Sequence, residues 1–270
     1  VEACSAEGEW TREAPCSGRC AGGVCTPFTA VALGGAHSCA LAADGAVACW
    51  GDNVEAQLGH AHQEGSGPKL GPDRALPAPV LGLKDVKAIA VGDEHACALR
   101  RDGALRCWGS NDFGQLGDGS NEERDLPVAP AGLREKVVQV AVGDYHSCAL
   151  LDDGSARCWG ANDEGQLGTG SVDRPKGPGG PAILGMAAPE GPALVHALGV
   201  VTVLESRGNL TCALDTRGQV ACWGIPLGYG AMVEHAARRG KNRPAAVRGL
   251  RDAVQDSYFR ITLTLGYAFR

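Results

Sequence analysis

The stretch HSCALAADGAVACWG at 37–51 decides the fold of this chain, because it returns three more times in register. The later copies are HACALRRDGALRCWG at 95–109, HSCALLDDGSARCWG at 146–160 and LTCALDTRGQVACWG at 210–224. Their tryptophans, at positions 50, 108, 159 and 223, are 58, 51 and 64 residues apart. That spacing is typical of propeller blades and solenoid units. The chain is therefore a repeat protein, and its function belongs to the assembled array.

Each copy predicts a β-hairpin. In the first copy Cys39, Leu41, Val47 and Cys49 alternate with smaller residues on either side of Asp44-Gly45. A period of two on both sides of such a pair indicates two short strands joined by a tight turn. Glycine supplies the positive φ that this kind of turn needs, and all four copies keep it at the turn.

Two further strands are predicted upstream of each later hairpin. Residues 80–83 and 86–92 precede the second copy, and residues 128–133 and 137–143 precede the third. A similar pair follows the fourth copy within 247–254. Four short strands in a unit of about 50 residues are what a propeller blade needs. We therefore expect an all-β propeller of repeat blades.

A glycine-rich connector follows three of the four tryptophans. It reads NVEAQLG at 53–59, NDFGQLG at 111–117 and NDEGQLG at 162–168. Polar side chains in a non-strand segment can hydrogen-bond backbone groups that would otherwise stay unpaired. We therefore assign a structural role to the amides of the connectors: Asn53, Gln57, Asn111, Gln115, Asn162 and Gln166.

The combined pattern, G-x-x-H-x-x-A-L-x-x-D-G-x-x-x-x-W-G-x-N-x-x-G-Q-L-G, closely resembles the regulator of chromosome condensation repeat over roughly residues 31–250. This resemblance implies a β-propeller, usually of seven blades. The family includes a nuclear nucleotide-exchange factor and secreted bacterial binding proteins. Because of its cysteine pairs, we expect this chain to be of the bacterial secreted type.

Length and charge exclude several classes of protein. A chain of 270 residues with 44% hydrophobic content can bury a full core, and no apolar run approaches the ~18 residues of a membrane helix. A net charge of −6 argues against binding to nucleic-acid phosphates. We interpret the one basic cluster, within 238–251, as a solvated loop. We expect almost no helix and a monomeric chain.

The cysteines predict disulfides and an oxidising compartment. If the first turn is centred on Asp44, positions 39 and 49 lie directly opposite, close enough for a disulfide. Such bonds place the chain outside the cell, at its surface or in a periplasm. The four predicted hairpin pairs are Cys39/Cys49, Cys97/Cys107, Cys148/Cys158 and Cys212/Cys222.

A zinc site is the alternative for these cysteines, because His37, His95 and His146 each lie two residues before one of them. The fourth copy has Leu210 in place of the histidine and still keeps both cysteines. The C-x-x-C spacing common in zinc sites is also absent. Disulfides are therefore favoured, and no metal or other cofactor is expected. We assign the histidines a hydrogen-bonding role in each blade.

The two ends of the chain differ from the repeats. Residues 1–29 predict a small disulfide-rich segment with almost no strand pattern, followed by the propeller at 30–270. Residues 252–270 predict a degenerate fifth hairpin without cysteine or tryptophan. Four blades, five blades and part of a larger ring are all compatible with the sequence, and we favour five. The N-terminal cysteines, whose pairing stays open, are Cys4, Cys16, Cys20 and Cys25.

No catalytic constellation is present: the sequence lacks G-x-S-x-G, H-E-x-x-H and a phosphate loop. We therefore expect an exported, non-enzymatic scaffold that recognises a protein or a surface glycan through its loops. The insertion at 172–198 offers Ile183, Leu184 and Met186 as apolar contacts for a partner. A nucleotide-exchange factor for a small GTPase, implied by the resemblance alone, and a polysaccharide-acting enzyme are the alternatives.

Overall fold

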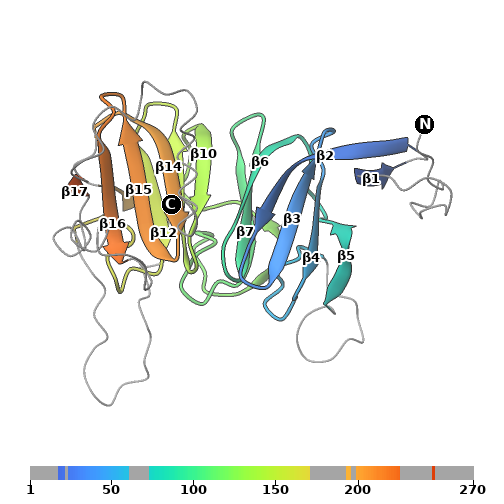
Figure 1. Cartoon of the computed structure of the whole chain (residues 1–270). Helices are drawn as coiled ribbons and strands as arrows, with labels where there is room; N and C mark the ends of the chain where they lie inside the picture. The colour runs from blue at the N-terminus through green and yellow to red at the C-terminus, as the bar shows by residue number, and fades with distance from the viewer. Residues whose placement is uncertain are drawn as a thin grey trace, which may run out of the picture.

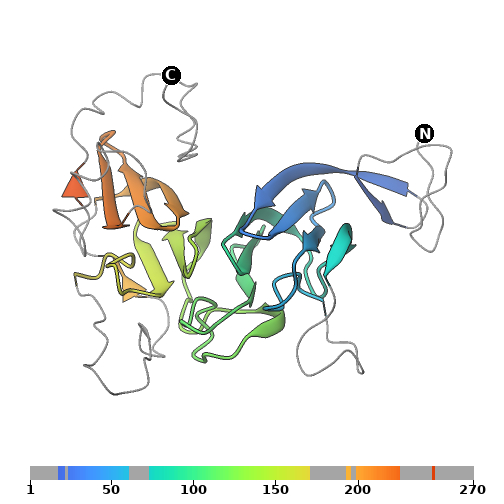
Figure 2. The ribbon, with the colours of Figure 1, turned by 60° about the horizontal axis from the view of Figure 1, so that its bottom comes forward.

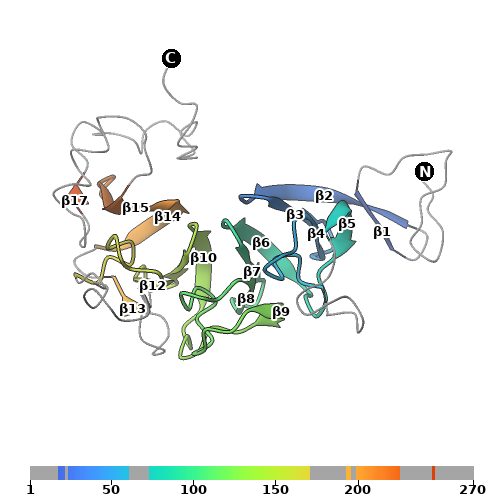
Figure 3. The same ribbon diagram turned by 90° about the horizontal axis from the view of Figure 1, so that it is seen from below.

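Four antiparallel sheets make up the described part of the molecule (Figure 1). The computed structural model describes residues 18–21, 24–60, 73–170, 193–195, 199–225 and 245–246. Every regular element in those ranges is a β-strand, so the all-β prediction is confirmed. The sheets stand side by side along an arc, which is the arrangement of propeller blades (Figures 2 and 3).

Each sheet is one blade, numbered in chain order. Blade 1 contains β1 (Gly18–Ala21), β2 (Val24–Leu33), β3 (His37–Ala42), β4 (Val47–Gly51) and β5 (Arg74–Pro79). Blade 2 contains β6 (Val86–Val91), β7 (His95–Arg100), β8 (Leu105–Gly109) and β9 (Arg124–Val128). Blade 3 contains β10 (Val137–Val142), β11 (His146–Leu151), β12 (Ala156–Gly160) and β13 (Ala193–Leu194). Blade 4 contains β14 (Val201–Arg207), β15 (Asn209–Asp215), β16 (Val220–Ile225) and β17 (Ala245–Ala246).

Successive blades meet through their innermost strands. The strands β2, β6, β10 and β14 are neighbours in that order and lie on the inner side of the arc, while β5 and β9 lie toward the outside (Figure 3). The chain therefore crosses each blade from the inside outward and then enters the next blade.

The predicted hairpins form the middle of every blade. In blade 1 the register pairs Cys39 with Cys49, and Gly45 at the turn has a φ of 82°. The same register places all four hairpin pairs at disulfide-bonding distance, with Cα atoms 4.1 Å apart. Each pair joins two strands of one blade and none joins two blades.

The hydrophobic core lies between the blades. One face of each sheet carries the cysteine pair, and the opposite face carries the tryptophan. Cys39 and Cys49 of blade 1 pack in one buried cluster with Trp108 of blade 2. The same arrangement recurs between blades 2 and 3 around Trp159, and between blades 3 and 4 around Trp223. A blade therefore buries its apolar faces only against its neighbours.

The prediction of strands at 80–83 and 128–133 is wrong. The outer strands β5 and β9 end at Pro79 and Val128, before or at the start of those ranges. The residues that follow form turns in which Gly82 has a φ of 75°. The turn around Gly82 ends the pairing with the neighbouring strand, although the apolar residues beside it suggest a strand in the sequence. The predicted pair also belongs to two blades, because β5 closes blade 1 and β6 opens blade 2.

Strands also occur in the N-terminal segment, which we expected to hold almost none. The strands β1 and β2 form a hairpin in which Cys20 lies opposite Cys25. The strand β2 then continues past residue 29 and pairs with β3 as the inner strand of blade 1. Small residues in β2 obscure the alternation of apolar and polar side chains that would predict a strand. Its pairing partner, β3, belongs to the first repeat.

Other sequence predictions fall outside the described residues. They concern Cys4, Cys16, the contacts Ile183, Leu184 and Met186, and the fifth hairpin at 252–270.

Candidate functional site

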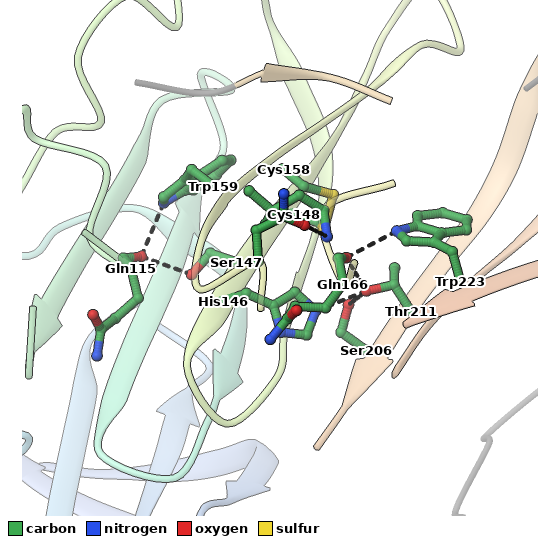
Figure 4. The surroundings of a disulfide bond; sticks show 12 residues. Gln115, His146, Ser147, Cys148, Cys158, Trp159, Gln166, Ser206, Thr211 and Trp223 are labelled. Atoms are coloured by element: carbon green, nitrogen blue, oxygen red, sulfur yellow. Dashed lines mark hydrogen bonds between the residues drawn. A yellow bond between two sulfur atoms is a disulfide. The ribbon is translucent and has the colours of Figure 1, made fainter. Parts of the chain in front are cut away.

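A buried polar network joins blades 2 and 3 (Figure 4). The Nε2 atom of His95 lies 2.8 Å from the Oγ atom of Ser147. That hydroxyl donates to the backbone oxygen of Gln115 over 2.9 Å. The indole N–H of Trp159 donates to the same oxygen over 2.9 Å. One backbone carbonyl of the Gln-Leu-Gly connector thus accepts from two side chains of the next blade.

Blades 3 and 4 repeat this network with threonine in place of serine (Figure 4). The Nε2 atom of His146 lies 2.7 Å from the Oγ1 atom of Thr211. Both Thr211 and the indole of Trp223 donate to the backbone oxygen of Gln166, over 3.3 and 2.9 Å. The hydroxyl is therefore the shared element, and serine or threonine can supply it.

The interface between blades 1 and 2 lacks the hydroxyl. Ala96 stands where the other interfaces have Ser147 and Thr211, by the register of its strand. Trp108 still donates its indole N–H to the backbone oxygen of Gln57 over 3.0 Å. Neither ring nitrogen of buried His37 has a side-chain hydrogen-bond partner among the described residues.

Burial keeps the three histidines neutral. It lowers the pKa of His95 and of His146 to about 3. It lowers the pKa of His37 to about 4, while a polar contact with the backbone of Asp93 and the charge of Asp93 oppose the shift. Imidazoles with such values exchange no protons near neutral pH, so they are poorly suited to acid–base catalysis. The expected hydrogen-bonding role holds for His95 and His146, although the bonds run between blades and not within one.

The connector amides have the structural role that the sequence predicts. The side-chain oxygen of Asn111 accepts from the backbone N–H of Leu116 over 2.9 Å, and Asn53 and Asn162 make the equivalent bond. The side-chain oxygen of Gln115 accepts from the backbone N–H of Phe113 over 2.9 Å. Gln57 and Gln166 make the matching bond in their own connectors.

One end of the blades gathers acidic side chains. We call it the connector end, because the Gln-Leu-Gly connectors and the loops between the first two strands of each blade lie there and bond to each other. Burial raises the pKa of Glu94, and the nearby carboxylates of Asp93, Asp112 and Asp52 raise it further. Burial and Asp93 also raise the pKa of Asp144. Carboxylates of three successive blades therefore repel one another at this end.

Two aromatic rings lie among these carboxylates. The rings of Phe113 and Tyr145 are tilted against each other with centroids 5.2 Å apart, and both are partly exposed. The Tyr145 hydroxyl donates to a carboxylate oxygen of Asp93 over 3.3 Å. Burial and the nearby Asp93 raise the pKa of Tyr145 to about 12, so the phenol keeps its proton. Sequence reasoning missed this group because its members lie in three blades.

The opposite end, where the hairpin turns lie, carries charges of both signs. A cavity of about 350 Å³ between the turn of blade 2 and the loop before β10 is lined by Asp102, Arg106, Arg134, Glu135 and Lys136 among others. Glu135 is already paired with Arg157, whose guanidinium lies 2.6 Å away. The lining of this cavity therefore combines three basic side chains with two acidic ones.

Two kinds of feature are absent from the part of the chain that the structure describes. It contains no group of three or more His, Cys, Asp or Glu side chains placed to hold a metal ion. It also contains no helix long and apolar enough to span a membrane.

Comparison with protein families gives two matches to the regulator of chromosome condensation (RCC1) repeat. One family model of that repeat matches residues 44–99 and 102–150. A second matches residues 28–57, 86–115 and 137–166. Together the matches run from 28 to 166, more than half of the chain, and they cover the first three hairpins.

Individual relatives agree with these matches. The E3 ubiquitin-protein ligase HERC2 of Homo sapiens is 31% identical over 229 residues, which are 82% of this chain and 4% of HERC2. The RCC1 domain-containing protein RUG3 of Arabidopsis thaliana is 30% identical over 73% of this chain and 42% of its own. The crystal structure of Prp20p from Saccharomyces cerevisiae superposes with a TM-score of 0.62 at 24% identity, over 83% of this chain and 51% of Prp20p. The chain thus spans about half of that solved propeller and far less of the ligase.

Proposed function

The chain belongs to the regulator of chromosome condensation repeat family, and we propose that it is an exported, non-enzymatic propeller that binds a protein partner through its connector end. The observation that carries this proposal is the meeting of carboxylates and an aromatic pair from three blades at that end. Loops held on rigid sheets are where propellers place recognition residues.

The charge of the connector end indicates the chemistry of the partner. Burial and then neighbouring carboxylates raise the pKa of Glu94 and of Asp144 there. The five carboxylates of this end are Asp52, Asp93, Glu94, Asp112 and Asp144. A partner that brings lysine or arginine would relieve this repulsion, and complementary potentials speed association and fix orientation. Partly exposed aromatic residues such as Tyr145 add the contact area typical of protein interfaces. A protein with a positively charged surface fits better than an uncharged glycan.

The relatives support protein binding as the general role. Prp20p is a propeller with described binding properties toward Gsp1p and histones. HERC2 is a ubiquitin ligase, and only 4% of its length matches this chain. The activities of both proteins are therefore proposals at most for this chain. We favour a binding module over an enzyme because the buried histidines act between blades and the carboxylates form no isolated pair.

Export is proposed from the cysteines. Four pairs at disulfide-bonding distance, all buried, suit an oxidising compartment. An exchange factor for a small GTPase works in reducing cytosol or nucleus, where such pairs would not stay oxidised. Nucleotide exchange is therefore the weaker candidate.

Neutralising the connector end tests the proposal. The variant Glu94→Gln with Asp112→Asn removes two charges from the acidic group without removing either aromatic ring. Immobilised natural chain should capture a set of proteins from an extract of the organism of origin at low salt. We expect this variant to capture at most half as much protein as the natural chain. Raising the salt to about 0.3 M should reduce capture by the natural chain to the same extent, because exposed charges are screened.

A charge-matched control uses the turn end. Asp44→Asn with Asp102→Asn removes two charges there, and asparagine before glycine suits a hairpin turn. This control should capture as much as the natural chain. Equal capture by all three proteins would contradict a role for the connector end. Nucleotide release from a small GTPase, accelerated by the natural chain, would favour the exchange-factor alternative.

A further inference from the structure

The cavity between the hairpin turn of blade 2 and the loop before β10 combines an apolar lining with basic side chains. We call it the turn-end cavity. Its volume is about 350 Å³, which is enough for a small organic molecule. Its apolar lining includes the buried residues Leu105, Pro130 and Val137 and the partly exposed Leu133. Its basic side chains are those of Arg106, Arg134 and Lys136.

Both acidic side chains of the turn-end cavity are already engaged. One oxygen of Asp102 lies 3.2 Å from the guanidinium of Arg100, and the other accepts from a backbone N–H of the same turn over 3.0 Å. One oxygen of Glu135 lies 2.6 Å from the guanidinium of Arg157, and the other accepts from the backbone N–H of Arg134 over 3.0 Å. Neither Arg100 nor Arg157 lines the cavity. The two carboxylates are therefore balanced by cations outside it.

The three basic side chains have no such partners. Arg106 donates to the backbone oxygen of Leu105 over 2.8 Å. Within the described part of the chain, Arg106, Arg134 and Lys136 make no ion pair and no hydrogen bond to another side chain. A Cβ atom at Gly103 would lie 2.5 Å from Cγ of Lys136, so the glycine of the turn leaves room for the lysine stem. The cavity thus holds three positive charges that no carboxylate neutralises.

The lysine of the turn-end cavity is not a requirement of the repeat. In each described interface the first residue of the inner strand donates a backbone bond to the glycine of the preceding turn. The residue just before that donor is Lys136 between blades 2 and 3, but it is Asp85 between blades 1 and 2 and Val200 between blades 3 and 4. The fold therefore accepts an acidic, a basic or an apolar side chain at this position.

The unpaired arginine is also particular to this interface. By strand register, Ala48 of blade 1 and Arg157 of blade 3 correspond to Arg106. The arginine of blade 3 is paired with Glu135. The combination of an unpaired arginine and an unpaired lysine beside an apolar surface therefore occurs at one of the three described interfaces. Because packing does not need it, ligand recognition is the function that it fits.

We propose that the turn-end cavity binds a small phosphate ester with an apolar body. The phosphate oxygens accept from Arg106, Arg134 and Lys136, and the apolar body packs on Leu105 and Leu133. Guanidinium groups match phosphate oxygens in geometry as well as in charge. A phosphate monoester brings nearly two charges and three terminal oxygens, whereas a carboxylate brings one charge and two oxygens. The cavity lies at the end opposite to the acidic connector end, so this inference does not depend on the function proposed above.

Titration of the full, ¹⁵N-labelled chain with phenyl phosphate at pH 7.5 tests the proposal. We expect saturable changes of the amide chemical shifts at Gly103 and Val137, with a Kd of about 1 mM or below. Inorganic phosphate lacks the apolar body and benzoate lacks the second charge. Each of them should bind at least about tenfold more weakly than phenyl phosphate.

A double variant made of residues that blade 1 already carries removes the cations. Arg106→Ala with Lys136→Asp installs the alanine and the aspartate that occupy these positions between blades 1 and 2. It should weaken binding of phenyl phosphate at least about tenfold. The control Lys84→Asp with Lys87→Ala changes the net charge by the same amount at two exposed lysines that do not line the cavity. The control should bind phenyl phosphate as the natural chain does.

The possible results separate clearly. No saturable shift change at Gly103 and Val137 of the natural chain would overturn the proposal, and this measurement needs no variant. Benzoate or inorganic phosphate binding as tightly as phenyl phosphate would also overturn it. So would equal binding by the two double variants, because the effect would then not come from the cations of the cavity. Unaltered thermal unfolding of both variants should accompany the expected loss.

Discussion

The interface between blades 1 and 2 and the interface between blades 2 and 3 have the same plan but differ by one hydroxyl. Between blades 2 and 3, Ser147 links His95 to the backbone oxygen of Gln115. Between blades 1 and 2, Ala96 replaces that serine, and His37 is buried without a side-chain hydrogen-bond partner in the described residues. An unpaired buried imidazole costs free energy that a paired one does not. The first interface is therefore the weaker one.

Some contacts are common to all the described interfaces, and others are missing from one of them. All three described interfaces keep the bond from tryptophan to the connector carbonyl and the packing of the indole on the cysteine pair. The histidine–hydroxyl pair is present in two of them. Apolar packing and the indole bond hold the array together, and the histidine pair adds to them.

Acid should weaken all the interfaces, and this is the largest effect we expect. In the folded state His95 and His146 have pKa values of about 3 and His37 of about 4, whereas an unfolded histidine titrates near ~6.5. Below pH 6.5 the unfolded state binds more protons, so the free energy of unfolding falls as pH falls. Each histidine should contribute a loss of about 1.4 kcal/mol between pH 7.5 and 5.5, about 4 kcal/mol in all.

Urea unfolding at the two pH values measures this loss. His37 regains its proton in the folded state at a higher pH than the other two, so its contribution ends near pH 4 and theirs near pH 3. His95→Leu should remove about a third of the pH dependence. A free energy of unfolding that stays constant from pH 7.5 to 5.5 would contradict buried neutral histidines.

Replacing single histidines by leucine, the residue that blade 4 has at this position, should distinguish the two interfaces. At pH 7.5 His95→Leu should lower the free energy of unfolding by about 2 kcal/mol, because a buried hydrogen bond is lost. His37→Leu should change it by less than about 0.5 kcal/mol, because no hydrogen bond to a hydroxyl of the next blade is lost there. Chemical denaturation of both variants gives the two values. Equal losses would mean that the serine bond contributes nothing.

The substitutions Ala96→Ser and Ser147→Ala should have smaller effects, of opposite sign, on the free energy of unfolding. Ala96→Ser should raise the free energy of unfolding by about 1 kcal/mol, because His37 and the backbone oxygen of Gln57 both gain a partner. Ser147→Ala should lower it by about 1–2 kcal/mol, because Nε2 of His95 loses its partner. Thermal unfolding of the two variants beside the natural chain reports both signs. Destabilisation by Ala96→Ser would indicate that the hydroxyl does not fit.

Local patterns in the sequence were enough to predict the hairpins and the connectors. Asp44-Gly45 places the turn, so the pairing of Cys39 with Cys49 follows from counting residues on each side. The amide of Asn111 bonds inside its own connector, five residues away. Interactions of this range can be deduced from spacing within a single unit.

Features that depend on a neighbouring blade could not be predicted in this way. Most residues of the outer strand β5 are exposed, so its sequence shows little alternation of apolar and polar residues. The sequence therefore predicts the strand in the more apolar residues that follow it. The lack of a partner for His37 depends on Ala96, which lies in another blade. The acidic group at the connector end needs the order of the blades in space before Glu94 and Asp112 can be recognised as neighbours.

If disulfide-bonded hairpins stiffen an exported binding propeller, the natively isolated protein has no free thiols in its hairpins, and its thiol content can be measured. The protein is denatured without reductant, alkylated and mapped by peptide mass spectrometry. We expect no label on the eight hairpin cysteines: Cys39, Cys49, Cys97, Cys107, Cys148, Cys158, Cys212 and Cys222. Stoichiometric labelling of these cysteines would contradict it and place the protein in a reducing compartment.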